Sequence, residues 1–251
     1  MRPGVEAVEN GFLDGKLRIL QPAEGYRAAT DPVLLAACTP AVSGQSVLDL
    51  GTGVGTAALC LCHRVEGLEL HGLEKQAEYT VLARRNADQN SIPMQVHDGD
   101  ILMMPPELKQ RSFDVVITNP PWHGETSFAS PVPGRDIANR MAEMTLSVWI
   151  TAAFTRLLPG GWFVMIQRAV WLPEILGALY TRAGHIAVLP LQAREGRDAK
   201  RVIVKARKGT QGPFRIAPPL VLHAGSAHVE DGDDYSPIAR AILRDGAGFD
   251  F

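Results

Sequence analysis

The 251-residue sequence has few of the residues that mark several classes of protein. Only three cysteines occur, Cys38, Cys60 and Cys62. Their odd number and their spacing exclude a disulfide framework and a zinc site, and are typical of a protein from a reducing compartment. The seven histidines show no metal-ligand spacing either, so we expect no metal cofactor.

Long apolar runs and a strong net charge are also lacking. The opening "MRPGVEAVEN" has no apolar signal-peptide core, and no stretch has the length of a membrane span. We therefore expect a cytoplasmic protein without membrane association. A net charge of −2 argues against a surface that binds polyanions throughout, although a local basic face is compatible with it. Nothing indicates an obligate protein partner, and a monomer and a homodimer both remain open.

Strands and helices alternate from Ser46 onwards. Five apolar runs favour strands: "SVLDL", "LELHGL", "MQVHD", "FDVVITN" and "WFVMIQ". Segments with helical spacing lie between them, including "TAALCLCHR" and residues 139–157. This alternation predicts an α/β fold, a Rossmann-like, doubly wound and mostly parallel sheet. The last two strands, "HIAVLPL" and "KRVIVKA", follow without a helix between them. We expect them to form an antiparallel hairpin at one edge of a seven-stranded sheet.

The flanking regions suggest a division into three parts. Residues 1–45 form a lead-in with a short hairpin and a helix over 32–38, for which Asp31 is the expected N-cap and Pro32 the first helical position. Residues 46–208 form the alternating domain. Residues 209–251 are expected to be an appendage with an acidic stretch and a short helix opened by Ser236 and Pro237.

A glycine-rich turn follows the first strand of the alternating domain. "VLDLGTGVGT" contains Gly51, Gly53 and Gly55 at the position where open parallel sheets bind ligands. The dinucleotide fingerprint GxGxxG does not fit, because the third glycine comes one residue early. Asp49 lies two residues before the first glycine, where a carboxylate suits an ammonium group better than a pyrophosphate.

Acidic residues follow the next two strands. Glu74 can accept the two hydroxyls of a ribose, and Asp100 can lie near an adenine edge, with Asp98 as a competitor. A ligand with an amino group, a ribose diol and an adenine but no phosphate is S-adenosylmethionine. The alternative is a structural glycine turn with acids that face solvent, which accounts less well for the order of these residues on successive strand ends.

The string "NPPW" ends the fourth strand. The amide oxygen of Asn119 and the carbonyl of Pro120 can accept both N–H groups of a planar amine and stabilise the positive charge that develops on its nitrogen. Pro120 and Pro121 stiffen the loop, and Trp122 offers a face for base stacking. These four residues are the candidate catalytic set. The alternative is a loop stop with an aromatic residue at the rim.

These residues resemble a known family. "VLDLGTGVGTAAL", "GLE", "GDIL" and "FDVVITNPPW" are similar to motifs I to IV of class I S-adenosylmethionine-dependent amino-methyltransferases. "QPAEGYRAATDPVLLAA" resembles the lead-in of the small-domain group that includes the tRNA(Val) adenine-N6 methyltransferases. The resemblance covers about 17–208. It implies that the lead-in packs over the cofactor, with Arg27, Thr30 and Asp31 near its methionine end, and that S-adenosylhomocysteine is the product. The group usually has tyrosine in place of Trp122, so a hydroxyl is absent here.

Two segments supply candidate RNA contacts. In the long loop 123–138, His123 is a candidate pocket wall and Arg135 a candidate phosphate contact, as is the nearby Arg140. Segment 194–208 carries seven basic and two acidic residues, a net charge of +5, and includes Arg197, Lys200 and Arg201. Ordinary surface charges, or basic residues that protect a sheet edge from aggregation, are the alternatives.

The leading hypothesis is therefore an S-adenosylmethionine-dependent N-methyltransferase acting on a base amino group of structured RNA, most directly adenine N6 in tRNA. Two alternatives share the fourth motif, a protein glutamine N5-methyltransferase and an rRNA guanine N2 methyltransferase. A non-catalytic scaffold or sensor that binds S-adenosylmethionine is a further alternative, against which the joint presence of Asp49, Glu74 and Asn119 argues.

Overall fold

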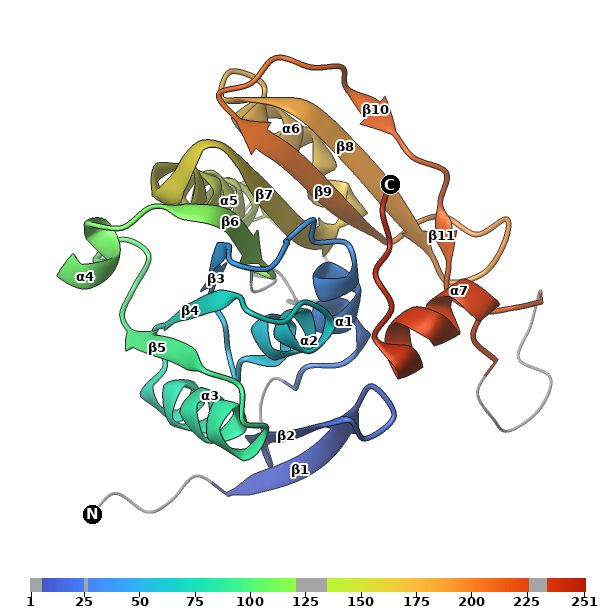
Figure 1. Cartoon of the computed structure of the whole chain (residues 1–251). Coiled ribbons are helices and arrows are strands. Elements are labelled where there is room, and N and C mark those ends of the chain that lie inside the picture. Colours follow the sequence, from blue (N-terminus) through green and yellow to red (C-terminus); the bar gives the residue numbers. More distant parts are fainter. Residues whose placement is uncertain (1–5, 25–26, 121–134, 226–233) are drawn as a thin grey trace.

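A central sheet covered by helices on both faces forms the body of the protein in the computed structural model (Figure 1). The structure describes residues 6–24, 27–120, 135–225 and 234–251, and for 135–145 the backbone alone. Within these ranges the sheet has nine strands, in the order β10-β8-β9-β7-β6-β3-β4-β5, with β11 also paired to β8. The strands are β3 Ser46–Leu50, β4 Glu69–Glu74, β5 Met94–Asp98, β6 Phe113–Thr118, β7 Leu157–Arg168, β8 Ala183–Gln192, β9 Arg201–Lys208, β10 Arg215–Ile216 and β11 Leu220–Val221.

The sheet topology confirms the predicted fold class. Strands β3 to β7 pair in parallel, and β9 is antiparallel to both β7 and β8. The seven expected strands are all present, and β8 and β9 form the expected antiparallel hairpin toward one edge of the sheet. The second strand of the hairpin, β9, lies between β8 and β7. The two-residue strands β10 and β11 pair in parallel with β8 and extend the sheet beyond it.

Continuous apolar strands separate two hydrophobic clusters. On β6, Val115 and Ile117 belong to one cluster, and Val116 points into the other. A strand buried on both faces carries apolar residues on both, which is why "VVI" in the middle of β6 shows no alternation. The first cluster takes residues from α1 Thr30–Ala37, α2 Thr56–Arg64 and α3 Ala77–Gln89. The second takes them from α4 Pro106–Lys109, α5 Arg135–Arg156 and α6 Leu172–Leu179. A 3-10 turn, Ala169–Trp171, precedes α6.

Helix α1 begins differently from the prediction. Its N-cap is Ala29, which makes no side-chain capping bond, and Asp31 lies within the first turn. The expected N-cap at Asp31 is therefore wrong. The physical reason is a stronger partner, because the Asp31 carboxylate forms an ion pair with Arg201 of β9.

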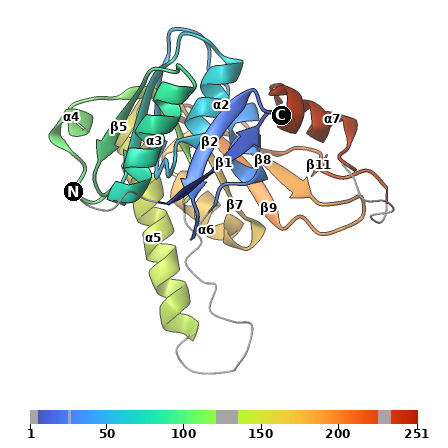
Figure 2. The same cartoon turned by 90° about the horizontal axis from the view of Figure 1, so that it is seen from below.

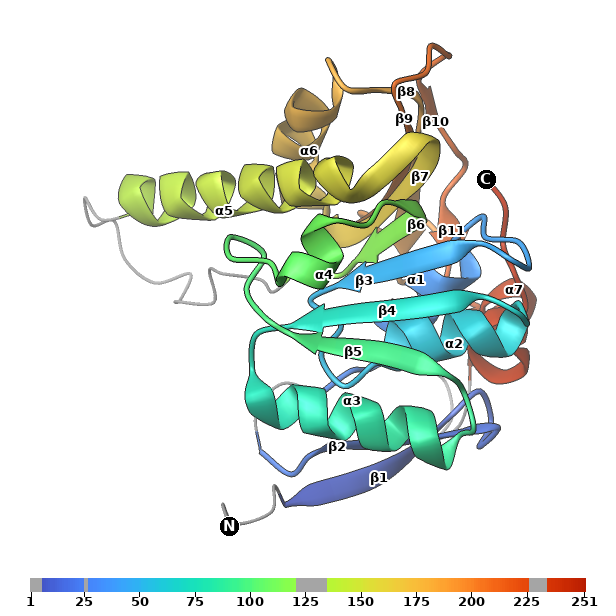
Figure 3. The ribbon, with the colours of Figure 1, turned by 60° about the vertical axis from the view of Figure 1, so that its left-hand side comes forward.

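The two flanking regions pack on the α1–α3 side of the sheet. The hairpin β1 Ala7–Phe12 and β2 Leu17–Pro22 lies along α3 (Figure 3). At the other end, α7 Pro237–Arg240 is capped by Ser236, whose Oγ accepts from the backbone of Ala239 at 3.2 Å. A π-helical turn, Ala241–Asp245, follows. Within the described ranges, no helix has the length and apolar character needed to cross a bilayer.

Candidate active site

The turn after β3 has a backbone conformation that favours glycine. Gly51, Gly53 and Gly55 have φ of 72°, 56° and 88°, a region that costs other residues free energy. Gly51 has a second constraint, because a Cβ there would lie 2.7 Å from the indole ring of Trp149. Gly53 has nothing within 4 Å of that position, which leaves the loop open on that side.

Strand β4 holds this loop in place. The backbone N–H groups of Gly51 and Thr52 donate to the carbonyl of Leu73 at 2.8 and 3.0 Å. Glu74, the next residue, accepts from the backbone of Gly53 through Oε2 at 3.0 Å and from that of Gln76 through Oε1 at 2.9 Å. The carboxylate predicted to meet a ribose is thus buried beside the glycine loop.

Asp49 lies beneath the loop with 2% of its surface exposed. Its Oδ2 accepts from Thr52 Oγ1 at 2.8 Å. The pKa of Asp49 is raised to about 7, chiefly by burial; hydrogen bonds from Thr52 and the Ala58 backbone oppose this shift, and the nearby Glu74 charge contributes to it. Around neutral pH the carboxyl is therefore poised between its two forms, and a cation beside it would favour the charged one.

One cleft at the carboxyl ends of the strands brings several predicted residues together. Its lining is Ala28, Pro32, Asp49, Gly51, Thr52, Gly53, Val54, Thr56, Ala57, Tyr79 and Asn119. The hydroxyl of Thr56 is buried and has no hydrogen-bond partner among the described residues. Buried hydroxyls usually have a partner, so this one is available to a ligand. In the sequence, Thr56 occupies the position at which the dinucleotide fingerprint has its third glycine.

Trp149 on α5 connects the glycine loop to the strand that ends at Asn119. Its Nε1 donates to Thr118 Oγ1 at 2.6 Å, and that hydroxyl donates to the carbonyl of Leu50 at 2.8 Å. In the sequence, Trp149 is one apolar residue of the helix expected over 139–157. Its contact with Gly51 shows that it also supports the site.

The remaining residues of the fourth motif are described only in part. Pro120 is buried after β6. Pro121, Trp122 and His123 lie outside the described residues. Arg135 and Arg140 belong to the first turns of α5, whose amino-terminal half projects beyond the body of the molecule (Figure 2).

The acidic residues after β5 have their own partners. Asp100 accepts from the backbone of Leu102 at 2.9 Å and pairs with Lys75 at 2.7 Å. These two contacts, the Leu102 bond first, lower the pKa of Asp100. Asp98 is bound by Arg84 and by Thr80 Oγ1, at 2.5 and 2.6 Å. Neither acid is among the residues that line the cleft.

The lead-in residues Arg27, Thr30 and Asp31 are not among those that line the cleft, although their neighbours Ala28 and Pro32 are. Arg27 donates to Asn10 Oδ1 at 2.7 Å. Thr30 opens α1 and is half-buried between Ala29 and the buried Asp31. Burial raises the pKa of Asp31, and the Arg201 guanidinium opposes that shift.

Segment 194–208 directs much of its positive charge inward. Five of its seven cations contact other parts of the chain: Arg194 with Asp234, Arg201 with Asp31, Lys205 with Asp250, Arg207 with the Gly160 carbonyl and Lys208 with the Leu157 carbonyl. Arg197 and Lys200 are exposed in the loop between β8 and β9. The net charge of +5 therefore overstates the basic surface that the segment presents.

Residues 29–181 match the model of a protein family, methyltransferase small domain. The chain belongs to this family. Two similar relatives are tRNA1(Val) (adenine(37)-N6)-methyltransferases. The protein of Actinobacillus succinogenes is 30% identical over 76% of this chain and 72% of its own length. That of Cronobacter sakazakii is 27% identical over 72% of each. This chain is an S-adenosylmethionine-dependent methyltransferase.

Solved structures share the fold of this methyltransferase. A predicted O-methyltransferase from Agrobacterium tumefaciens has a TM-score of 0.71 at 24% identity, over 88% of this chain and 99% of its own. A T. thermophilus 16S rRNA guanine N2 methyltransferase, in complex with AdoMet and guanosine, has a TM-score of 0.55 at 22% identity. The match covers 82% of this chain and 51% of the other.

The residues of the cleft fit S-adenosylmethionine chemically. Asp49 can take a charge that suits an ammonium group, Thr56 has an unused hydroxyl, and Gly53 leaves room for close approach. Glu74 is a carboxylate beside the loop. Among the residues that the structure describes, no group of three or more His, Cys, Asp or Glu side chains is arranged to hold a metal ion.

Proposed function

We propose that this methyltransferase modifies the N6 amino group of adenine in structured RNA, with tRNA as the substrate. The observation that carries the proposal is the position of Asn119, which follows β6 and lines the same cleft as Asp49 and the glycine loop. The names of the relatives at 27–30% identity support adenine N6 in tRNA as the target.

Asp49, Glu74 and the glycine loop are the proposed cofactor-binding residues. Asp49 would hold the ammonium group, and Gly51, Gly53 and Gly55 would let the backbone approach the ligand. Glu74 would accept ribose hydroxyls with the lone pairs that its bonds to the Gly53 and Gln76 backbones leave free. Arg27, Thr30, Asp31 and Asp100 form the outer part of the proposed site. S-adenosylmethionine, when bound, supplies a methyl group on a positively charged sulfur.

Asn119 and Pro120 would orient the acceptor nitrogen. The Asn119 side-chain oxygen and the Pro120 carbonyl would each accept one N–H of the adenine amino group, which directs its lone pair toward the methyl donor. Their dipoles would stabilise the charge that develops on that nitrogen, and they require no reorganisation during the reaction. Pro121 would stiffen the loop and Trp122 would stack on the base.

The proposed RNA contacts are not equivalent. Arg197 and Lys200 are exposed and can reach phosphates. Arg201 is held by Asp31, so its contribution to RNA binding would compete with that ion pair. Arg135 and Arg140, in the first turns of α5, and His123 stay candidates for contacts with the RNA.

The test is transfer of labelled methyl groups followed by identification of the product. The protein is incubated with tritium-labelled S-adenosylmethionine and, in separate reactions, unmodified tRNA, unmodified rRNA or a ribosomal protein fraction. We expect label in tRNA, recovered as N6-methyladenosine. Label recovered as N2-methylguanosine or as methylglutamine would replace the proposal with one of the alternatives. Cofactor binding without transfer to any fraction would favour a sensor.

Two variants separate catalysis from cofactor binding. Asn119→Ala removes one proposed acceptor of the amino group, so we expect turnover to fall by about 100-fold or more with little change in cofactor affinity. Glu74→Gln removes a charge from the proposed ribose contact, so cofactor affinity should fall. A loss of cofactor affinity in Asn119→Ala would contradict the assigned role.

A further inference from the structure

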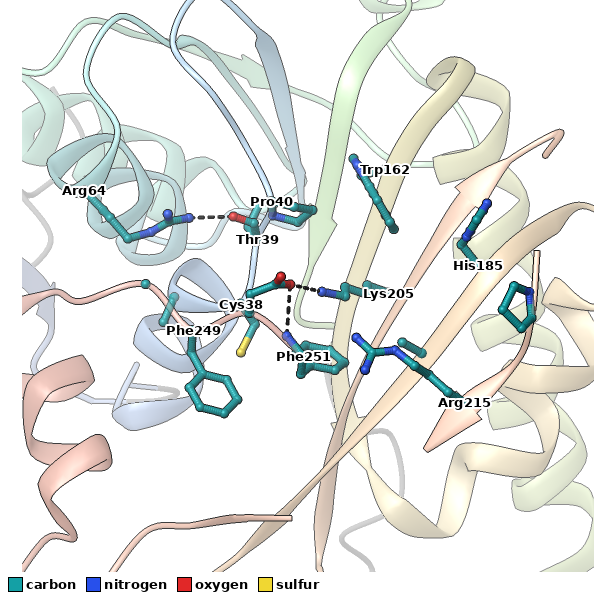
Figure 4. A pocket seen from close by; sticks show the side chains of 15 residues that line it. Cys38, Thr39, Pro40, Arg64, Trp162, His185, Lys205, Arg215, Phe249 and Phe251 are labelled. Atoms are coloured by element: carbon teal, nitrogen blue, oxygen red, sulfur yellow. Dashed lines mark hydrogen bonds and ion pairs between the residues drawn. The ribbon is translucent and has the colours of Figure 1, made fainter. Parts of the chain in front are cut away.

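A second cavity lies apart from the proposed active site. It has a volume of about 570 Å³ and shares no lining residue with the cleft around Asp49. Trp162 of β7, Ala187 of β8 and Lys205 of β9 contribute from the sheet. Arg64, Arg215 and residues 248–251 also line it (Figure 4).

This cavity and the cleft lie at opposite ends of the strands. Trp162 lies in the first half of β7 and pairs with Arg207, near the end of the antiparallel strand β9. The cleft lies where the parallel strands end, whereas this cavity lies toward their beginnings. Figure 3 shows the C-terminal end of the chain on that side, away from the projecting half of α5.

Positive charge exceeds negative charge in the lining. The side chains of Arg64, Lys205 and Arg215 carry three positive charges against one negative charge on the side chain of Asp250. Lys205 is almost fully buried, and its Nζ lies 2.6 Å from Asp250 Oδ1. The Asp250 side chain is 93% exposed, so this buried ammonium group has a partner that a stronger anion can displace.

Arg64 supplies an unused hydrogen-bond donor. Its Nη2 donates to the carbonyls of Ala36 and Thr39, at 3.0 and 2.5 Å. Its Nε is buried and finds no acceptor among the described residues. Since buried donors are nearly always paired, a free N–H beside excess positive charge favours an anionic ligand. In Figure 4 the side chains of Arg64 and Arg215 approach from opposite sides of the C-terminal segment.

Flat aromatic groups complete the lining. Trp162, Phe249 and Phe251 take part, and Lys205 Nζ lies 4.2 Å from the centre of the Phe251 ring. Ligand pockets typically have volumes of about 300–1,000 Å³, so the cavity suits one small ligand rather than a length of polymer. A ligand that is both anionic and planar matches the positively charged and the aromatic side chains of this lining.

We propose that this cavity binds a nucleotide, with its phosphate between Lys205 and Arg215 and its base against Trp162. The inference does not depend on the proposed methylation reaction, because it rests on a separate set of residues. The nucleotide has two possible sources, a free nucleoside monophosphate or one nucleotide of a bound RNA. Both present the same base and phosphate chemistry to the cavity.

The phosphate would compete with Asp250 for Lys205. This competition predicts effects of opposite sign at two positions in one cavity. Arg215→Ala removes a phosphate partner and should weaken binding about tenfold, as expected for the loss of one charge-assisted hydrogen bond. Asp250→Asn removes the competing charge, keeps an amide oxygen near Lys205 and should strengthen binding.

The experiment is calorimetric titration of the full chain with adenosine 5′-monophosphate. Saturating S-adenosylhomocysteine is present throughout, so that the nucleotide cannot enter the cofactor cleft. Adenosine and inorganic phosphate are titrated separately, and each should bind more weakly than the nucleotide. Arg85→Ala, an exposed arginine on α3, is the matched control and should bind the nucleotide as the unaltered protein does. Trp162→Leu should weaken binding of the nucleotide and of adenosine but not of phosphate.

A short single-stranded RNA then distinguishes the two sources. Displacement of the bound monophosphate by this RNA, with the same response to Arg215→Ala, would identify a nucleotide of RNA as the occupant. Failure of the RNA to displace it would identify the free nucleotide. The proposal is overturned if the unaltered protein does not bind the monophosphate at millimolar concentration. Equal binding by Arg215→Ala, Asp250→Asn and the control would overturn it as well.

Discussion

Asp49 illustrates how burial gives one residue its chemistry. A carboxyl with 2% exposure loses most of the hydration that stabilises its charged form, and Glu74 nearby adds a second negative charge. Both effects disfavour ionisation. The same environment makes a positively charged ligand group a strong partner, because it replaces the lost hydration with a direct interaction.

Cofactor binding should depend on pH through Asp49. Its pKa in the unliganded fold is about 7, so the carboxyl is largely neutral below that pH and must lose a proton to hold an ammonium group. We expect the affinity for S-adenosylmethionine to rise with pH up to about 7, by up to about tenfold per unit, and to level off above it. Calorimetry from pH 5.5 to 8.5 measures this dependence.

Asp49→Asn should bind the cofactor weakly and lose this dependence. The control is Asp88→Asn, an exposed acid on α3, which should keep both the affinity and the profile. A flat profile for the unaltered protein would contradict the role of Asp49.

The raised pKa of Asp49 also means that the folded state holds more protons than the unfolded state between about pH 4 and 7. Asp49 thus lowers stability as pH rises through that window.

Two glycines of the same loop allow a matched comparison. Both Gly51→Ala and Gly53→Ala place a side chain at positive φ, which costs about 1–3 kcal/mol. Only at Gly51 would the new Cβ lie 2.7 Å from Trp149. We expect Gly51→Ala to lower the free energy of unfolding more than Gly53→Ala, as measured by urea denaturation. Equal losses would show that Trp149 yields easily and does not fix the loop.

At the scale of elements, prediction succeeded where one local pattern decides the structure. Helix α2 has the predicted bounds, because a glycine turn precedes it and its apolar spacing is regular. Ser236 caps α7 as its sequence suggests. Strands β10 and β11 have two residues each, too few to show a period. Their pairing with β8 depends on where the tail packs, which no local pattern records.

For the candidate site too, the sequence predicted what local patterns decide and missed what depends on packing. The sequence predicted the residues that end strands, because the carboxyl ends of parallel strands meet at one edge. Asp49, Gly51, Gly53 and Asn119 do share a cleft. The bond from Trp149 to Thr118 and the ion pair between Asp31 and Arg201 join residues 31 and 170 positions apart. Such contacts depend on the packing of whole elements, and sequence spacing does not encode them.

Strands β4 and β5 are linked by a pair of histidines that should respond to pH. His71 Nδ1 lies 3.0 Å from His97 Nε2, the rings stack, and His71 Nε2 lies 3.3 Å from Glu69 Oε1. Burial lowers the pKa of both histidines. Protonation of His71 is opposed by Arg111 and by the His97 ring and is favoured by Glu69. Protonation of His97 is opposed by Arg111 and Arg84 and is favoured by Glu107.

The folded state therefore binds fewer protons at these rings than the unfolded state. As pH falls below about 6.5, the usual pKa of histidine, the two rings increasingly destabilise the fold. Above that pH their effect on stability vanishes. We expect the urea midpoint to fall between pH 7 and 5, less steeply in His97→Gln. His185→Gln is the control, because His185 belongs to β8 and not to this pair. Parallel profiles for His97→Gln and the unaltered protein would contradict the assignment.

At the scale of the whole molecule, the last residues close one side of the fold. The backbone of Phe249 donates to the Ala37 carbonyl at 2.9 Å, and Asp250 pairs with Lys205. Phe251 is 6% exposed and belongs to the same hydrophobic cluster as α1 and α2. These contacts lie at the ends of the strands opposite the cleft, and they join the last residues to a core that also includes Val54 and Ala57 of the cleft.

This arrangement predicts that the tail affects stability more than cofactor binding. Phe251→Ala should lower the free energy of unfolding by about 3 kcal/mol, the lower end of the range for a buried phenylalanine. Phe214→Ala is the matched control, because that ring is 51% exposed and its loss should cost little. Urea denaturation measures both. Calorimetry below the transition should give the same affinity for S-adenosylmethionine in all three proteins, because Phe251 does not line the cleft around Asp49. If cofactor affinity instead fell along with stability in Phe251→Ala, the two ends of the strands would be coupled. Helix α1 would be the element that connects them, because its residues contribute to both the cleft and the second cavity.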